Sequence, residues 1–199
     1  MKHSVFVLCL FVCVVFLASP VQAIPISFNF SSGENLELSS LALQTEGLQL
    51  AVAAADAAGA AAVITQTQEG LGVYRGGSDA KALDGYGVDD LLLFSFSSAV
   101  RLISVSFSLV EAGDSFTLLV DGNQYFKAPL LTPYVDFVAG NFVGKLFVFS
   151  ADEDRADYRI QQIIVDDLSA APVPEPSSWM LLSLGVAGLA GFGRFRRNN

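Results

Sequence analysis

Residues 94–109 begin with Phe94-Ser95-Phe96-Ser97 and end with Val105-Ser106-Phe107-Ser108-Leu109. Each run alternates a large apolar residue with a serine. Successive side chains of a β-strand point to opposite faces, so a period of two places the apolar residues on one face and the serines on the other. The stretch therefore predicts strands with one buried and one solvated face.

Further runs of this kind follow the chain on both sides, at residues 26–30, 48–52, 116–120, 142–149 and 158–168. Asp121-Gly122-Asn123, between two apolar runs, predicts a tight hairpin. Eight or nine short strands at this spacing predict an all-β fold. We expect a single jelly-roll-like β-sandwich over residues 24–170, with a barrel as the alternative.

An alanine-rich segment, residues 51–62 (AVAAADAAGAAA), conflicts with this pattern, because alanine has the highest helix propensity. Gly59 interrupts the segment, no amphipathic stripe is present, and strand-like runs flank it. We therefore expect a strand to Ala54, a loop over residues 56–59 and a new strand over residues 61–66. A short helix remains the alternative.

Residue composition excludes several kinds of chemistry. The single histidine, His3, and both cysteines, Cys9 and Cys13, lie near the N-terminus, so residues 24–172 contain neither type. This excludes thiol nucleophiles, disulfides, Ser-His relays and imidazole or thiolate zinc sites from that part. It carries 19 acidic and 7 basic side chains, a formal charge of −12. That charge disfavours nucleic acid and leaves calcium or polysaccharide as compatible partners.

The N-terminal segment has the three parts of a secretory signal. Met1-Lys2-His3 is basic, residues 5–18 are almost wholly apolar, and residues 19–23 end with small residues. This order predicts a signal peptide over residues 1–23, cleaved by signal peptidase after Ala23. An uncleaved anchor is the alternative, but the apolar run is short for a span of about 20 residues.

The C-terminal segment, residues 171–199, contains a second apolar run. Residues 179–192 carry no charge, and Arg194, Arg196 and Arg197 follow them. A helix over residues 177–195 would be about 28 Å long at about 1.5 Å per residue, close to the hydrocarbon thickness of a bilayer. We therefore expect one transmembrane helix with its arginines on the cytoplasmic side.

Pro174-Glu175-Pro176 precedes this apolar run. Two prolines around a carboxylate favour an extended, exposed segment that is a good protease substrate. The order V-P-E-P-S-S, a glycine-rich apolar span and a final F-R-R resembles the PEP-CTERM sorting signal of exopolysaccharide-producing Gram-negative bacteria. The same short region is also labelled the C-terminal domain of ice-binding proteins.

The resemblance implies a function in sorting. An exosortase, a membrane cysteine protease/transpeptidase, would recognise Pro174, Glu175 and Pro176, while the three arginines hold the tail. The precursor would sit in the inner membrane with residues 24–170 in the periplasm. The processed protein would then reach the cell surface or the extracellular matrix, linked to exopolysaccharide and biofilm.

A glycine-rich stretch, residues 70–90, contains the best candidate metal ligands: Asp84, Asp89 and Asp90, with Asp79 nearby. Calcium takes six to eight oxygen ligands, and flexible glycine-rich backbone exposes carbonyl groups as well. The spacing is not that of an EF-hand, and an ordinary solvated loop is the alternative. Calcium is the one cofactor that the sequence suggests.

Two shorter resemblances concern the same region and the last strand. The GLGV loop at residues 70–73 and the Asp-Asp before LLLFSF resemble passenger domains of PEP-CTERM proteins. Residues 163–169 (IIVDDLS) also resemble the closing strand of jelly-roll carbohydrate-binding modules, in which an acidic residue often helps to bind structural calcium. By that resemblance Asp166 and Asp167 are candidate ligands for the same ion.

Three classes of function follow. The first is a non-enzymatic surface or matrix protein, and the second is a calcium-dependent carbohydrate-binding module. The third, a carboxylate-based glycosidase, would need two acids across a cleft. Asp152-Glu153-Asp154 and Asp157 lie among arginines and fit a solvated, paired surface loop better, so we expect no enzyme. Sugar stacking is weakly supported: the only tryptophan lies in the tail, leaving the loop tyrosines Tyr74, Tyr86, Tyr125 and Tyr134.

Overall fold

Both serine–phenylalanine runs lie on one long strand, β8 (Asp90–Ser108), in the computed structural model. The structure describes residues 25–77, 81–151, 156–169 and 185. Within these residues it contains thirteen strands and one short 3-10 helix. The remaining elements, in chain order, are β1 (Ile26–Asn29), β2 (Leu36–Leu38), β3 (Leu41–Thr45), β4 (Leu48–Asp56), β5 (Ala61–Thr67), β6 (Gly70–Tyr74), β7 (Leu83–Asp84), β9 (Ser115–Val120), β10 (Gln124–Pro129), β11 (Tyr134–Asp136), η1 (Val138–Gly140), β12 (Val143–Ala151) and β13 (Asp157–Asp167).

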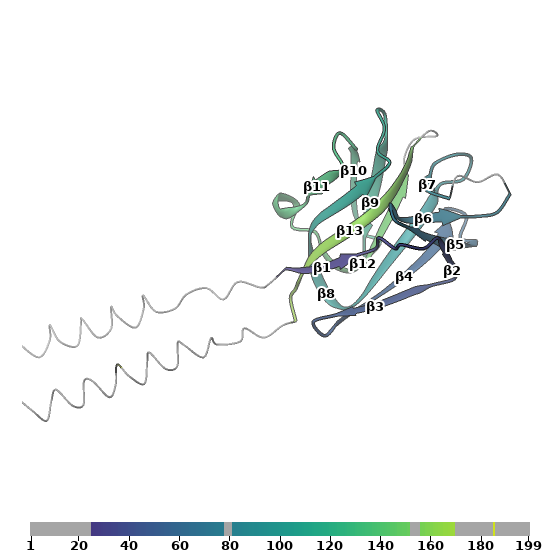
Figure 1. Ribbon diagram of the computed structural model, residues 1–199. Helices are drawn as coiled ribbons and strands as arrows, with labels where there is room; N and C mark the ends of the chain where they lie inside the picture. The colour runs from purple at the N-terminus through teal and green to yellow at the C-terminus, as the bar shows by residue number, and fades with distance from the viewer. Residues whose placement is uncertain (1–24, 78–80, 152–155, 170–184, 186–199) are drawn as a thin grey trace, which may run out of the picture. The chain divides into compact units, whose positions relative to one another are not determined.

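All strand pairs are antiparallel, and the main path of the network runs β1-β13-β6-β5-β4-β8-β12-β9-β10 (Figure 1). The first half of β8 pairs with β4 on one side and β12 on the other. Its second half pairs with β13 and β11. The prediction of an all-β fold is confirmed, and β8 is the strand that both halves of the network share.

The expected eight or nine short strands were too few, because the structure adds short strands such as β2, β7 and β11, although β8 joins two of the predicted runs into one. A one-residue shift lies within β8: Ser104 pairs with Ile164 and Leu102 with Val165, so Ile103 has no partner in this register. The buried positions of β8 accordingly change from even to odd residue numbers near this point. Such a bulge bends a strand and redirects its side chains.

The core is dominated by phenylalanine rings from several strands. Phe94 and Phe107 of β8 both contact Phe149 of β12, at centroid distances of 5.7 and 6.4 Å. Phe107 also lies 5.3 Å from Phe116 and 5.4 Å from Tyr158. Each fully buried ring of this kind stabilises the fold by about 1.5–3 kcal/mol. The predicted apolar face is therefore the buried face in both runs as far as Phe107. Leu109 is the exception, because it follows the end of β8 and is 52% exposed.

The predicted hairpin over residues 121–123 is confirmed by the pairing of β9 with β10. Asp121 and Gly122 have φ values of 50° and 69°, as a tight turn with the twist of its flanking strands requires. The Asp121 carboxylate accepts hydrogen bonds from the backbone N–H groups of Lys145 (3.0 Å) and Leu146 (2.8 Å). One side chain thus ties the hairpin to β12.

The alanine-rich segment forms strands, as expected, and the alternative of a short helix is wrong. β4 continues to Asp56, two residues beyond the expected end, and β5 begins at Ala61. Asp56 closes the turn, because its carboxylate accepts a hydrogen bond from the Ala60 N–H at 2.8 Å. Pairing of β4 with β8 overrides the helix propensity of alanine in this segment.

The GLGV segment was expected to be a loop, and the structure places it in β6. A Cβ atom added at Gly70 or Gly72 would lie under 3.0 Å from backbone atoms of Ile160 or Lys81, respectively. Both glycines therefore allow other backbone segments to approach β6 directly. The Val73 N–H donates a hydrogen bond to the Ala82 carbonyl at 2.9 Å, which fixes the segment around Lys81 against this strand.

We expect Gly72→Ala to lower the free energy of unfolding by about 1–3 kcal/mol, because the added methyl group overlaps the Lys81 backbone. Gly33→Ala is the matched control, since nothing lies within 4 Å of a Cβ atom at that position. Urea unfolding of the purified full chain measures both variants. Equal stability of the two variants would contradict the role assigned to Gly72.

Candidate functional site

The expected sorting residues lie outside the described part of the chain. They are Ala23, Pro174, Glu175, Pro176, Arg194, Arg196 and Arg197. The signal peptide and the transmembrane helix expected from the sequence lie there too, apart from residue 185. Among the described residues, no helix is long and apolar enough to cross a membrane.

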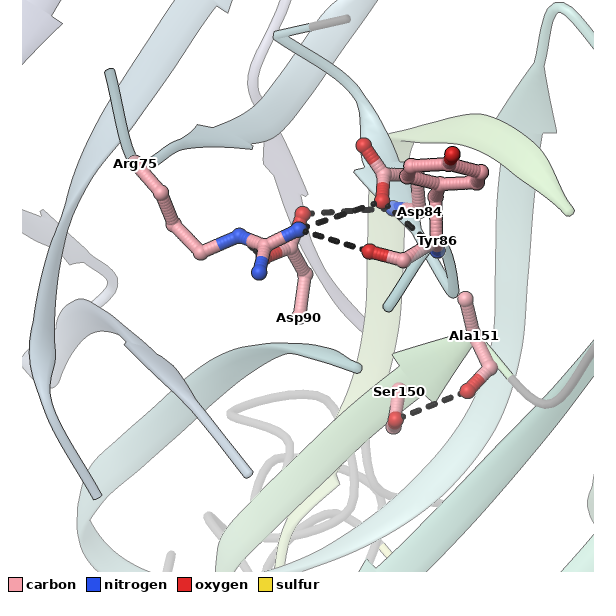
Figure 2. A network of polar contacts seen from close by, with 6 residues as sticks. All are labelled: Arg75, Asp84, Tyr86, Asp90, Ser150 and Ala151. Carbon is pink, nitrogen blue, oxygen red and sulfur yellow. Dashed lines mark hydrogen bonds and ion pairs between the residues drawn. The ribbon is translucent and has the colours of Figure 1, made fainter. Parts of the chain in front are cut away.

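Two of the predicted metal ligands, Asp84 and Asp90, lie together around an arginine (Figure 2). The Arg75 Nε atom lies 2.8 Å from Asp90 Oδ1, and its Nη2 atom lies 3.5 Å from Asp84 Oδ1. The Asp84 N–H also donates to Asp90 Oδ2 at 3.3 Å. Asp90 is fully buried, so a cationic side chain compensates the cost of removing its carboxylate from water.

The same network fixes the loop that follows β7. The Tyr86 N–H donates to Asp84 Oδ1 at 3.0 Å, and Arg75 Nη2 donates to the Tyr86 carbonyl at 3.2 Å. Tyr86 is nevertheless 80% exposed as a residue. Asp89 lies on this loop as an exposed residue, and its carbonyl accepts a hydrogen bond from the Ala57 N–H.

Asp166 and Asp167 lie at the opposite end of β13 from this network. Asp84 pairs with Asp157 at the start of β13, whereas Asp167 pairs with Val100. Ten residues of strand separate these points, about 33 Å at about 3.3 Å per residue. The expectation that either aspartate joins Asp84, Asp89 and Asp90 on one ion is therefore wrong.

Asp167 has a local structural role. Desolvation opposes its charge, but hydrogen bonds from the Ser169 N–H and hydroxyl and from the Ser98 hydroxyl outweigh it and lower the pKa of the carboxyl. These bonds, at 2.9, 2.7 and 3.0 Å, fix the end of β13 beside β8. Within the described ranges, no group of three or more acidic, histidine or cysteine side chains is arranged to hold a metal ion.

A polar groove that the sequence did not predict lies on another part of the β unit, by which we mean the strands between Ile26 and Asp167. It is a cavity of about 610 Å³, lined by residues 35–37 at β2, Thr65 and Thr67 of β5, Glu69, Lys81 and Arg159. We call it the Arg159 groove. Arg159 belongs to β13 and is only 6% exposed. Its Nη1 donates to Thr65 Oγ1 and to the Gly70 carbonyl, both at 3.3 Å, and its Nη2 donates to the Lys81 carbonyl.

The rim of the Arg159 groove carries charges of both signs. Lys81 Nζ lies 2.7 Å from Glu37 Oε1, and this hydrogen bond raises the pKa of the lysine. The Thr67 hydroxyl donates to Glu69 Oε2 at 2.7 Å and lowers the pKa of that carboxyl. At the base of the groove, burial lowers the pKa of the Arg159 guanidinium. The groove therefore offers donors and acceptors at fixed positions.

A second cavity, of about 560 Å³, lies over β3, β4 and β8. Gln44 and Gln49 face each other across β3 and β4 there, beside Ser95 and Ser97. Its lining is uncharged. The acidic cluster at residues 152–154 lies outside the described residues, and Asp157 is the first residue of β13.

Comparison with protein families places the PEP-CTERM protein-sorting motif at residues 172–197. The chain carries this sorting motif. The resemblance seen in the P-E-P, the apolar span and the arginines is thus confirmed. The PEP-CTERM motif implies an exported protein that an exosortase processes.

Curated proteins gave no match. Among solved structures, the chain is similar to the GH26-CBM35 β-(1,4)-mannanase of Podospora anserina, with 11% identity and a TM-score of 0.33. The match covers 77% of this chain and 29% of the mannanase chain. A likeness this distant carries no conclusion about fold or function.

We expect Arg75→Gln to lower the free energy of unfolding by about 3 kcal/mol, because it leaves the buried Asp90 carboxylate without its cation. Lys81→Gln is the control, since it breaks a solvent-exposed ion pair with Glu37, and such pairs contribute little to stability. Thermal and urea unfolding compare the two variants. A small, equal loss in both would mean that the Arg75 network does not stabilise the fold.

For calcium, we expect Ca²⁺ and Mg²⁺ at millimolar concentration to raise the melting temperature of the full chain equally. Arg75 already compensates Asp84 and Asp90, and any divalent cation relieves the repulsion of an acidic protein. Differential scanning fluorimetry of the wild type and Asp89→Ala measures this. A shift specific to Ca²⁺ and lost in Asp89→Ala would instead establish the calcium site.

Proposed function

We propose that this chain is the precursor of a non-enzymatic surface or matrix protein, displayed beside exopolysaccharide in a biofilm. The observation that carries the proposal is the PEP-CTERM motif at residues 172–197, which follows the last strand, β13. Its order along the chain suits a folded passenger followed by a sorting tail. We further propose that the passenger is a single jelly-roll-like β-sandwich.

The finer steps of export are part of the same proposal. Signal peptidase would remove residues 1–23, and the apolar run after Pro176 would hold the precursor in the inner membrane. The basic end, Arg194 to Arg197, favours a cytoplasmic C-terminus, which places the passenger in the periplasm. An exosortase would then cleave near the P-E-P and release the passenger to the surface or matrix.

A non-enzymatic role is supported by what the described carboxylates do. Asp84 and Asp90 hold Arg75, Asp121 holds a hairpin to β12, and Asp167 binds two serines. A glycosidase needs two carboxyl groups that face a sugar across a cleft, one of them with a raised pKa. Hydrogen bonds lower the pKa of two described acidic groups, Glu69 and Asp167, which is the opposite of what a general acid needs.

A carbohydrate-binding module is the second candidate function. The observation that favours it is the Arg159 groove, whose volume of about 610 Å³ lies within the range of small-molecule sites, about 300–1,000 Å³. Both candidates are compatible, since a displayed matrix protein gains a function by binding the surrounding polysaccharide.

Processing tests the first proposal directly. Mass spectrometry of the protein from its native host should show loss of residues 1–23 and of the apolar tail. Replacing Pro174, Glu175 and Pro176 by alanines should leave the tail attached and the protein in the inner membrane. The matched control replaces Pro129 and Pro133 of the β unit, which should leave processing unchanged. Intact C-terminal peptides in the mature surface form would overturn the proposal.

A further inference from the structure

We propose that the Arg159 groove binds a neutral saccharide through hydrogen bonds, without a metal ion. The inference rests on the proposed function, because it supplies the displayed protein with a contact to polysaccharide. It assigns this role to Arg159 at the base of the groove and to Glu37, Glu69 and Lys81 at its rim.

The first argument is the unusual position of Arg159. Its guanidinium is buried, and within the described residues its hydrogen bonds go to neutral oxygens of Thr65, Gly70 and Lys81. A guanidinium has five N–H donors, and these bonds use three of them. Burying a cation is costly unless its donors are satisfied. The remaining donors therefore suit oxygen atoms of a molecule in the groove.

The second argument is the balance of charge. Arg159 and Lys81 are opposed by Glu37 and Glu69, so the groove has no net formal charge. An anionic ligand would meet two carboxylates at the rim, on a chain whose residues 24–172 carry a formal charge of −12. A saccharide offers hydroxyl groups that both donate and accept, which matches donors and acceptors set side by side.

The third argument is that strand pairing and hydrogen bonds hold the backbone and Arg159 at the base of the groove in place. β2 pairs with β5, β5 pairs with β6, and Gly72 lets the Lys81 backbone lie directly on β6. Arg159 is fixed from three sides by its own hydrogen bonds. Polar groups that are already positioned lose little conformational entropy on binding. Leu36 adds an apolar surface against which the C–H face of a sugar ring can pack.

The test measures binding to the full chain by isothermal titration calorimetry, in a detergent that has no sugar head group. The probes are cellohexaose, laminarihexaose and maltohexaose as neutral saccharides, and hexagalacturonate as an acidic one. We expect at least one neutral probe to bind, also in the presence of EDTA. Glu69→Gln and Lys81→Gln should each weaken that binding about tenfold or more, as the loss of a hydrogen bond to a charged group does.

Two matched variants keep the charge change but lie outside the groove: Glu111→Gln and Lys145→Gln, both at exposed positions. They should bind as the wild type does, and all four variants should keep its melting temperature within a few degrees. Binding of none of the neutral probes, equal binding by all variants, or preference for hexagalacturonate would overturn the inference. Normal processing of such a chain in its host would leave the sorting proposal standing.

Discussion

The fold depends on a one-residue shift in β8. Phe94 and Phe107 lie thirteen positions apart, an odd number, so an unbroken strand would point them to opposite faces. The shift at Ile103 brings both rings to the same core, where both contact Phe149. β4 and β12 pair with the first half of β8 and β13 with the second, so the strands on both sides of this bulge contribute apolar side chains to one core.

The Arg159 groove depends on a second constraint, the absence of side chains at Gly70 and Gly72. Other backbone segments lie so close to β6 there that a Cβ atom would overlap them. The Lys81 carbonyl therefore comes within reach of Arg159 from β13, and Thr65 joins them from β5. Three of the five N–H donors of this buried guanidinium are thereby used, two of them on the backbone oxygens of Gly70 and Lys81. The groove above it is a consequence of strand packing.

Alternation and turn chemistry were sufficient to predict the all-β class, the hairpin at Asp121-Gly122 and the strands in the alanine-rich segment, because these depend on local sequence. The length of β8 was not predictable, since the bulge at Ile103 depends on pairing with β13, which lies over fifty residues away.

In the candidate site, the sequence indicated that the aspartates form a cluster, but it did not indicate their basic partner. In the sequence Arg75 is an isolated basic residue followed by two glycines. Its pairing with Asp84 and Asp90 depends on the folded structure. The Arg159 groove had no local signal, because its walls come from distant strands.

Arg75 and Arg159 both donate hydrogen bonds within the β unit, but their surroundings give them different roles. Arg75 lies between two carboxylates, so its charge is already compensated, and a ligand there would have to break that pairing. Arg159 is more deeply buried and its hydrogen bonds go to neutral oxygens, while Glu69 and Asp157 act on it through charge alone. A ligand oxygen at Arg159 therefore adds a charge-assisted hydrogen bond without displacing one. Carboxylates neutralise the charge of Arg75, which stabilises the fold. The hydrogen bonds of Arg159 go to neutral oxygens, which leaves its charge available to a ligand.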